Sequence, residues 1–221
     1  MGKTILTPKQ SQFLEYVSKD EQITRSFYLT GGTALSEFYL HHRISYDIDL
    51  FTEKQEVDQK LIEAFLKKIS KDLTVVEVKR SQMMGLISYI LIFDNQQKLK
   101  VDFNYYPFPR IEKGTCFKNL EVDSVYDIAA NKLHTIFMQP RSRDYLDLYV
   151  IMQRYNYSLN QLILAAKAKF DWHIDRITLA SQFIKATDFD ESSIMIIPFD
   201  KKSMDTFFLS LAKSLKEEIF K

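Results

Sequence analysis

The sequence places acidic side chains where they could bind a divalent cation. Asp47 and Asp49 stand two apart in a segment typical of a strand, with apolar Ile48 between them. Because successive strand residues point to opposite faces, the two carboxylates are expected on one face. Neighbouring carboxylates repel each other unless a proton or a cation intervenes, and their oxygens suit Mg²⁺ or Mn²⁺. We therefore expect this pair to bind a metal ion.

A third carboxylate is expected from a later strand. Asp102 lies between apolar Val101 and Phe103, so its side chain should point to the face opposite theirs. Together with Asp47 and Asp49 it would complete a two-metal site, which stabilises the attacking and leaving oxygens of a displacement at phosphorus.

The complementary part is a glycine pair that could bind phosphate. Gly31 and Gly32 are two of only five glycines in the chain, and Thr33 follows them at the start of an expected helix. Glycine lets the backbone approach a ligand closely, and a helix N-terminus offers N–H groups and partial positive charge. Thr33 could cap the helix or donate its hydroxyl to a phosphate. The pattern thus implies a nucleoside triphosphate chelated with Mg²⁺.

Each part of this pattern is weak alone. A Gly-Gly pair is more often a plain turn, and an Asp-x-Asp pair is more often a solvated strand edge. The full order is strand, Gly-Gly-Thr, helix, Asp-x-Asp strand and later Asp strand, and this order is far more specific than any of its parts.

An α+β fold is expected to position these residues. In the N-terminal half, the apolar patterns predict strands over 27–30, 46–51 and 73–79, a hairpin of 86–93 with 98–105, and helices over 7–20, 33–42 and 57–70. The pattern then becomes helical, with helices predicted over 123–138, 143–155, 159–170, 178–187 and 205–220. We expect an α/β core with its N-terminal helix over 1–110, and a helical domain over 111–221 that contributes to the active-site cleft.

Composition excludes several classes of protein. Hydrophobic residues make up 46% of the 221 residues, which argues against disorder. The single cysteine, Cys116, excludes a disulfide framework and a cysteine-based zinc site. The longest uncharged apolar stretch, 86–93, is far shorter than a membrane helix needs, and no signal peptide is evident. We expect a cytoplasmic protein without a membrane partner. A net charge of +1 gives no global argument for binding nucleic acid.

The segment LTGGTALSEFYLHHRISYDIDLF, residues 29–51, resembles the nucleotidyltransferases of the DNA polymerase β type. More narrowly it resembles the AbiEii group, the toxin half of type IV abortive-infection toxin–antitoxin pairs. That group carries a later Lys and an Arg-Asp-x-x-Asp-Leu stretch, and Lys132 and residues 143–148 match them. The resemblance covers about residues 27–150. Thr33 stands where many members of the wider superfamily carry Ser, and threonine retains the side-chain hydroxyl.

The resemblance implies a nucleotidyltransferase-type mixed sheet flanked by helices. It suggests that Arg43 and Ser45, just before the acidic strand, shape the site, with Arg43 contacting phosphate or Asp47. A structural salt bridge of Arg43 is an equal alternative.

The matching downstream residues could also take part in the reaction. Lys132 could neutralise triphosphate charge, Arg143 could bind a phosphate, and Asp144 could orient Lys132 or polarise the attacking group. The alternative is an ordinary interhelical salt bridge among these three residues. Asp147 is expected to be structural, paired with Arg143 at helical spacing.

The predicted activity is Mg²⁺-dependent transfer of a nucleoside monophosphate from a nucleoside triphosphate to an acceptor hydroxyl. The resemblance implies an RNA acceptor, such as a tRNA 3′ end, or a protein, together with a toxin role and a cognate antitoxin. Two alternatives stay open at this point. One is nucleotidyl transfer to a small molecule, and the other is a nucleotide-binding regulatory or neutralising module without catalysis.

Overall fold

The computed structural model describes residues 4–53 and 56–219, which form two compact units. The first unit comprises the chain up to Pro109 together with Lys113–Ser124, and the second comprises Arg110–Glu112 and the chain from Val125 onward. The division into independent domains at residue 110 stays a prediction.

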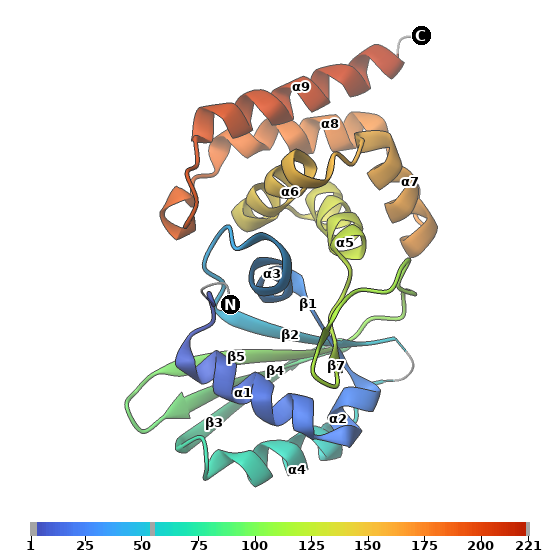
Figure 1. The fold of residues 1–221 in the computed structure, drawn as a ribbon. Coiled ribbons are helices and arrows are strands. Elements are labelled where there is room, and N and C mark those ends of the chain that lie inside the picture. Colours follow the sequence, from blue (N-terminus) through green and yellow to red (C-terminus); the bar gives the residue numbers. More distant parts are fainter. Residues whose placement is uncertain (1–3, 54–55, 220–221) are drawn as a thin grey trace. The chain divides into compact units, whose positions relative to one another are not determined.

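A mixed five-stranded sheet forms the centre of the first unit (Figure 1). Its order is β1-β2-β5-β4-β3, where only β2 and β5 run parallel and the other neighbours are antiparallel. The strands are β1 (Tyr28–Thr30), β2 (Asp47–Thr52), β3 (Val75–Met83), β4 (Leu86–Phe93) and β5 (Lys98–Tyr105). The predicted α+β fold is confirmed, and the predicted hairpin is β4 with β5.

Helices cover the sheet of the first unit. They are α1 (Pro8–Lys19), α2 (Glu21–Ser26), α3 (Gly31–Leu35), the π-helical η1 (Ser36–Leu40) and α4 (Gln59–Ser70). Thr7 and Gln10 form a capping box at α1, with Pro8 in the first turn, which is why this helix begins where the sequence predicts. Phe13 of α1 meets Phe65 of α4 edge-on, with ring centroids 6.0 Å apart. A short hairpin, β6 (Cys116–Phe117) with β7 (Leu120–Glu121), completes the unit.

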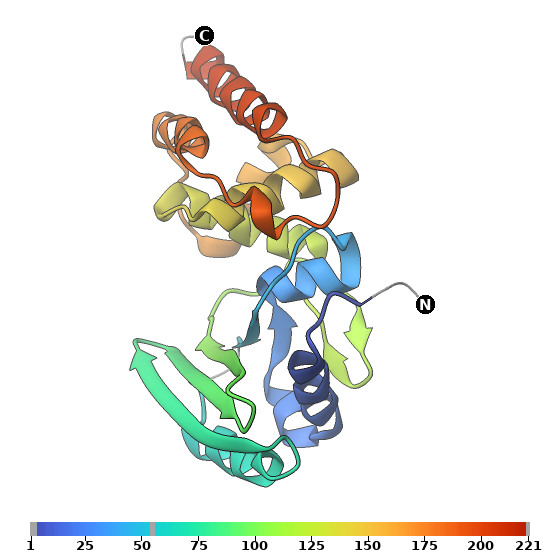
Figure 2. The same ribbon diagram turned by 90° about the vertical axis from the view of Figure 1, so that its left-hand side faces the viewer.

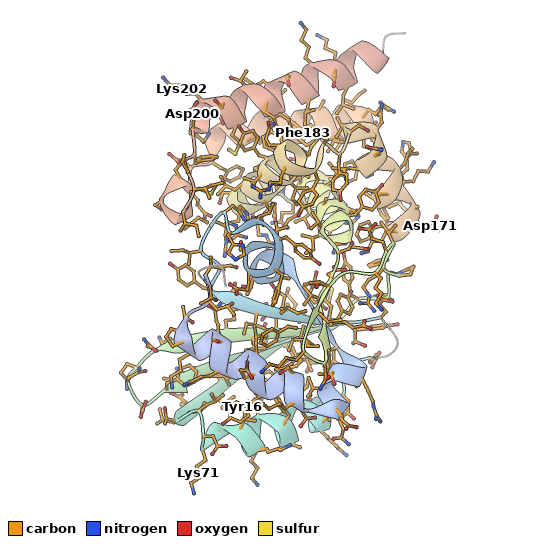
Figure 3. The ribbon with its side chains drawn as sticks, viewed as in Figure 1. Tyr16, Lys71, Asp171, Phe183, Asp200 and Lys202 are labelled. Atoms are coloured by element: carbon orange, nitrogen blue, oxygen red, sulfur yellow. The ribbon has the colours of Figure 1, made fainter. Side chains whose placement is uncertain are left out.

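The second unit is helical, as its apolar pattern predicts (Figure 2). It contains α5 (Val125–Met138), α6 (Ser142–Tyr155), α7 (Leu159–Phe170), α8 (Arg176–Ile184), the 3₁₀ turns η2 (Lys185–Asp188) and η3 (Ser192–Ile194), and α9 (Lys201–Ile219). Phe183 is fully buried and packs on Phe208 of α9, with ring centroids 5.5 Å apart (Figure 3). Tyr145 of α6 meets the same Phe208 ring edge-on, so aromatic packing joins α6, α8 and α9. Within the described residues, no helix is both long and apolar enough to span a bilayer.

Candidate active site

The parallel pairing of β2 and β5 sets the acidic side chains in one array. Asp49 is the register partner of Asp102, and Asp47 is the register partner of Lys100. Register partners and residues two apart on a strand share a face, so these four side chains lie on the same face of the sheet. The intervening Ile48, Leu50, Val101 and Phe103 are fully buried on the other face. The alternation expected from the sequence is therefore present in both strands.

Lys100 is the member of this array that the sequence analysis missed. Its Nζ lies 2.5 Å from Asp102 Oδ2 and 4.0 Å from Asp47 Oδ2. Burial acts to lower the pKa of Lys100, but the hydrogen bond to Asp102 and the charges of Asp102, Asp47 and Asp49 outweigh it and raise that pKa above its ordinary value. The available signal was the same alternation, because Lys100 stands two residues before Asp102.

The carboxylate of Asp102 is only half satisfied. Oδ2 accepts the hydrogen bond from Lys100, whereas the buried Oδ1 has no hydrogen-bond partner among the described residues. A buried carboxylate oxygen without a partner lowers the stability of the fold, and binding a divalent cation would satisfy it. In their present positions, however, no three His, Cys, Asp or Glu side chains of residues 4–53 and 56–219 converge on a metal-binding point. The carboxylate oxygens of Asp47, Asp49 and Asp102 are suitable donors for a divalent cation. Their side chains would have to move closer together to bind one.

Gly31 lies directly against one of these acids. Its φ is +75°, a conformation that L side chains rarely adopt. A Cβ at this position would lie 2.3 Å from Asp49 Oδ2, far closer than real contacts allow. Glycine is required here both for the backbone conformation and for the approach of the turn to Asp49.

Gly32 makes a second close approach, to Arg43 and Ser45. A Cβ on Gly32 would lie 2.3 Å from Arg43 Nη2 and 3.0 Å from Ser45 Oγ. Arg43 is almost completely buried and donates from Nη1 to the Ile44 carbonyl at 2.9 Å. The structure thus brings both predicted residues to the glycine turn. There the guanidinium supplies positive charge beside the backbone.

Side-chain hydrogen bonds fix this turn to its neighbours. The buried Thr33 hydroxyl donates to the carbonyl of Asp47, which ties the first turn of α3 to the acidic strand. The Thr30 hydroxyl donates to Asp123 Oδ2 at 2.7 Å, and Gln10 Nε2 donates to the Ser45 carbonyl at 2.8 Å. In this structure Thr33 therefore serves as a positioning residue.

The second unit contains a buried ion cluster on α5 and α6. Lys132 Nζ lies 2.8 Å from Asp144 Oδ1 and 2.7 Å from Asp147 Oδ2, and both aspartates are fully buried. Arg141 Nε lies 3.0 Å from Asp144 Oδ2. Burial acts to raise the pKa of Asp144, but Lys132 and Arg141 outweigh it and hold that pKa below its usual value.

The predicted pairing of Asp147 with Arg143 is wrong. Arg143 forms an ion pair with Glu191 at 3.8 Å, whereas Asp147 binds Lys132. Asp144 and Asp147 share the helix face that meets α5, where the Lys132 ammonium reaches both carboxylates. The structure therefore brings Lys132 and Asp144 together as expected, and it places Arg143 on a different partner.

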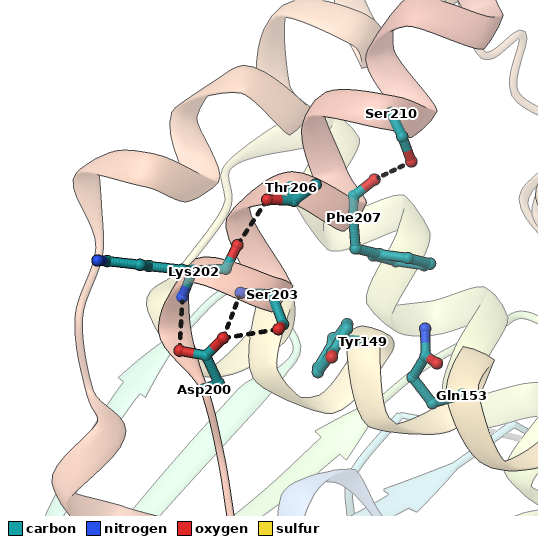
Figure 4. Close-up of a pocket in the computed structure, with 8 residues that line it drawn as sticks. All are labelled: Tyr149, Gln153, Asp200, Lys202, Ser203, Thr206, Phe207 and Ser210. Atoms are coloured by element: carbon teal, nitrogen blue, oxygen red, sulfur yellow. Dashed lines mark hydrogen bonds between the residues drawn. The ribbon is translucent and has the colours of Figure 1, made fainter.

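A cavity of about 390 Å³ lies elsewhere in the second unit, beside the start of α9 (Figure 4). Its acidic group, Asp200, accepts hydrogen bonds from the backbone N–H of Ser203 at 3.0 Å and from the Ser203 hydroxyl at 2.6 Å. Asp200 is thus used in capping α9. We assign this cavity no chemistry.

The chain is similar to known proteins over most of its length. Residues 12–214 match the family model described as nucleotidyl transferase AbiEii toxin, type IV toxin–antitoxin system. An uncharacterised protein of Aquifex aeolicus is 29% identical over 150 residues, which is 67% of this chain and 68% of that protein. The crystal structure of JHP933 from Helicobacter pylori superposes with a TM-score of 0.61 at 17% identity, covering 95% of this chain and 90% of that one. A second H. pylori structure, of a protein assigned as a nucleotidyltransferase, also has a TM-score of 0.61 at 17% identity, covering 96% and 97%.

Proposed function

The chain belongs to the AbiEii family of nucleotidyltransferases, and we propose that it transfers a nucleoside monophosphate to an acceptor hydroxyl in a reaction that requires Mg²⁺ or Mn²⁺. The observation that carries the metal requirement is the register of β2 and β5, which sets three carboxylates on one face. The buried, unpartnered Oδ1 of Asp102 supports it. Asp47, Asp49 and Asp102 would hold the metal, which when bound neutralises triphosphate charge and polarises the α-phosphate.

The glycine turn supplies the contacts for the triphosphate in this proposal. Gly31 and Gly32 keep the backbone close to Asp49 and to the Arg43 guanidinium. A ligand held at this turn would meet backbone N–H groups of α3 and the positive charge of Arg43, both of which favour phosphate. Ser45, whose hydroxyl also lies against Gly32, would add a polar contact at the same turn.

We also propose functional roles for Lys132 and Asp144, because the family match spans both residues. Lys132 would neutralise triphosphate charge, and Asp144 would orient its ammonium through the 2.8 Å ion pair. Arg143, at 40% side-chain exposure, would bind a phosphate once released from Glu191. Under this proposal Asp144 is a positioning residue for Lys132.

We further propose that the acceptor is RNA, such as a tRNA 3′ end, and that the protein is the toxin of a toxin–antitoxin pair in the cytoplasm. The support is the family description, which names a toxin, because a toxin that transfers nucleotides must modify an essential cellular molecule. An RNA acceptor also predicts binding that weakens steeply as salt increases.

The test is to incubate the full chain with Mg²⁺, each α-labelled nucleoside triphosphate and total cellular RNA, protein or small metabolites. We expect label on RNA. Asp47→Asn and Asp49→Asn should each lower labelling by roughly 100-fold or more, the scale of losing a major contact to transition-state charge. Glu56→Gln, which changes an exposed carboxylate of the same unit, is the matched control and should label normally. Label on protein or on small molecules would replace the RNA acceptor. Full labelling by either aspartate variant would overturn the metal-site assignment.

A further inference from the structure

The face that carries the proposed metal ligands also carries a cation of the protein itself. Asp47 stands opposite Lys100 and Asp49 stands opposite Asp102, so three carboxylates and one ammonium form a two-by-two array. Like charges directly opposite each other on neighbouring strands destabilise a sheet. Lys100 contacts Asp102 at 2.5 Å and Asp47 at 4.0 Å, and it therefore offsets part of this repulsion.

The Lys100 side chain is also able to leave. It is 41% exposed, whereas the Asp102 side chain that it contacts is 10% exposed. A lysine ammonium on its flexible stem can turn into solvent and recover its hydration there. Asp102 has a short side chain on a strand whose flanking Val101 and Phe103 are fully buried, so Lys100 is the partner that can turn into solvent.

We propose that Lys100 is the resident counter-ion of the carboxylate array, which holds Asp102 and Asp47 while no metal is bound and gives way when a metal–nucleotide complex binds. This rests on the proposed function, because it takes these carboxylates as the metal ligands. A free divalent cation would have to displace the Lys100 ammonium from the carboxylates and would offer that ammonium no new partner. A cation arriving with a triphosphate brings phosphate charge that compensates the displaced ammonium. Lys100 thus makes the site discriminate against free metal.

The experiment measures Mn²⁺ binding to the metal-free full chain without nucleotide, by calorimetry and by the loss of the free Mn²⁺ resonance signal. Lys100→Met should bind Mn²⁺ at least about tenfold more tightly than the wild type, because removing one positive charge at about 4 Å strengthens the local field. Its melting temperature without metal should fall, and the rise on adding Mn²⁺ should be larger than in the wild type.

Two variants control for the charge change. Lys98→Met removes an exposed lysine two residues earlier on the same face of β5 and should bind Mn²⁺ like the wild type. Lys100→Arg keeps the positive charge and should not bind more tightly. If Lys100→Met does not fold, Lys100→Gln serves in its place, and circular dichroism decides which variant is used.

The outcomes separate this inference from the proposed function. If Asp47→Asn abolishes Mn²⁺ binding while Lys100→Met binds no more tightly than the wild type, the role of Lys100 is overturned and the metal site stands. If Mn²⁺ binding is unchanged in Asp47→Asn and in Asp49→Asn, the metal site is overturned, and the role of Lys100 with it.

Discussion

At the scale of single residues, Gly31 carries the sharpest prediction. Gly31→Ala places a Cβ at φ +75° and 2.3 Å from Asp49 Oδ2, so either the turn or the carboxylate must move. We expect the variant to lose about 1–3 kcal/mol of unfolding free energy, the usual cost of one strained backbone position. It should also lose nucleotidyl transfer, because Asp49 is displaced. Chemical denaturation and the labelling assay measure the two effects.

Gly85→Ala is the comparison for this variant. Gly85 does not have a left-handed φ, and a Cβ there would lie 3.3 Å from the Tyr105 carbonyl, which requires only a small shift. It should cost less stability and leave transfer unchanged. Equal stability and activity of Gly31→Ala and the wild type would show that the close approach of Gly31 to Asp49 is not needed.

At this scale the sequence predicts an arrangement correctly where a single strand determines it. The two-residue repeat of a strand predicts that Asp47 and Asp49 share a face. The same repeat places Lys100 on one face with Asp102, but its importance depends on β5 lying beside β2. The partner of Asp147 could not be predicted in this way. Helical spacing suggests an arginine of the same helix, whereas the structure supplies Lys132 from α5.

At the scale of elements, the ion cluster between α5 and α6 gives a prediction for pH. The pKa of Asp144 is lower in the folded protein than its ordinary value of 3.8, so the folded state binds fewer protons there than the unfolded state. Its contribution to stability is therefore complete above pH 3.8 and is lost as pH falls through the lower folded pKa. Asp144→Asn should lower the unfolding free energy at neutral pH by roughly 3 kcal/mol, the scale of breaking a buried ion pair.

Denaturant unfolding at a series of pH values checks this. The Asn variant should show a weaker dependence on pH than the wild type below about pH 4, because one depressed carboxyl group has been removed. Asp171→Asn, at an exposed helix C-cap, should follow the wild type. Parallel curves for Asp144→Asn and the wild type would contradict the assignment of the low pKa to Asp144.

Some element boundaries followed from the sequence and others did not. The cap at Thr7 and the apolar stripe of α1 are local signals, and they place that helix correctly. The six-residue α2 was missed because its N-cap, Asp20, was taken as the end of α1. The helix expected over 33–42 begins two residues earlier at Gly31 and ends in a π turn at Leu40, where His41 takes a left-handed conformation. A π turn depends on packing around it rather than on a local signal.

At the scale of the whole molecule, one buried carboxylate assigns the connecting segment to the second unit. Asp127 accepts hydrogen bonds from the backbone N–H groups of Ile111 at 2.8 Å and Glu112 at 3.1 Å, and it forms a fully buried ion pair with Lys169 at 2.7 Å. Residues 110–112 therefore belong to the second unit although the chain returns to the first unit at Lys113.

Asp127→Ala should release this segment. We expect trypsin to cut after Arg110 and Lys113 roughly tenfold faster in the variant, because cleavage follows the population of the locally opened state. Lys169→Met removes only the ion pair and should give a smaller increase. Cleavage at the wild-type rate in Asp127→Ala would show that the segment is held by other contacts. The sequence could not predict this arrangement, since it depends on contacts between residues that are 15 to 42 positions apart.

The parallel pairing of β2 with β5 has a consequence for how this protein can change. The backbone ladder that aligns Asp49 with Asp102 is the same one that buries Ile48 and Val101 on the opposite face. A slip of one residue would turn every acid into the core and every core residue outward. Substitutions of Ile48 or Val101 should therefore reach the chemistry through the alignment of the strands. Substitutions at these positions should change stability and activity together. A variant that changes only one of the two properties has to be sought at other positions in the chain.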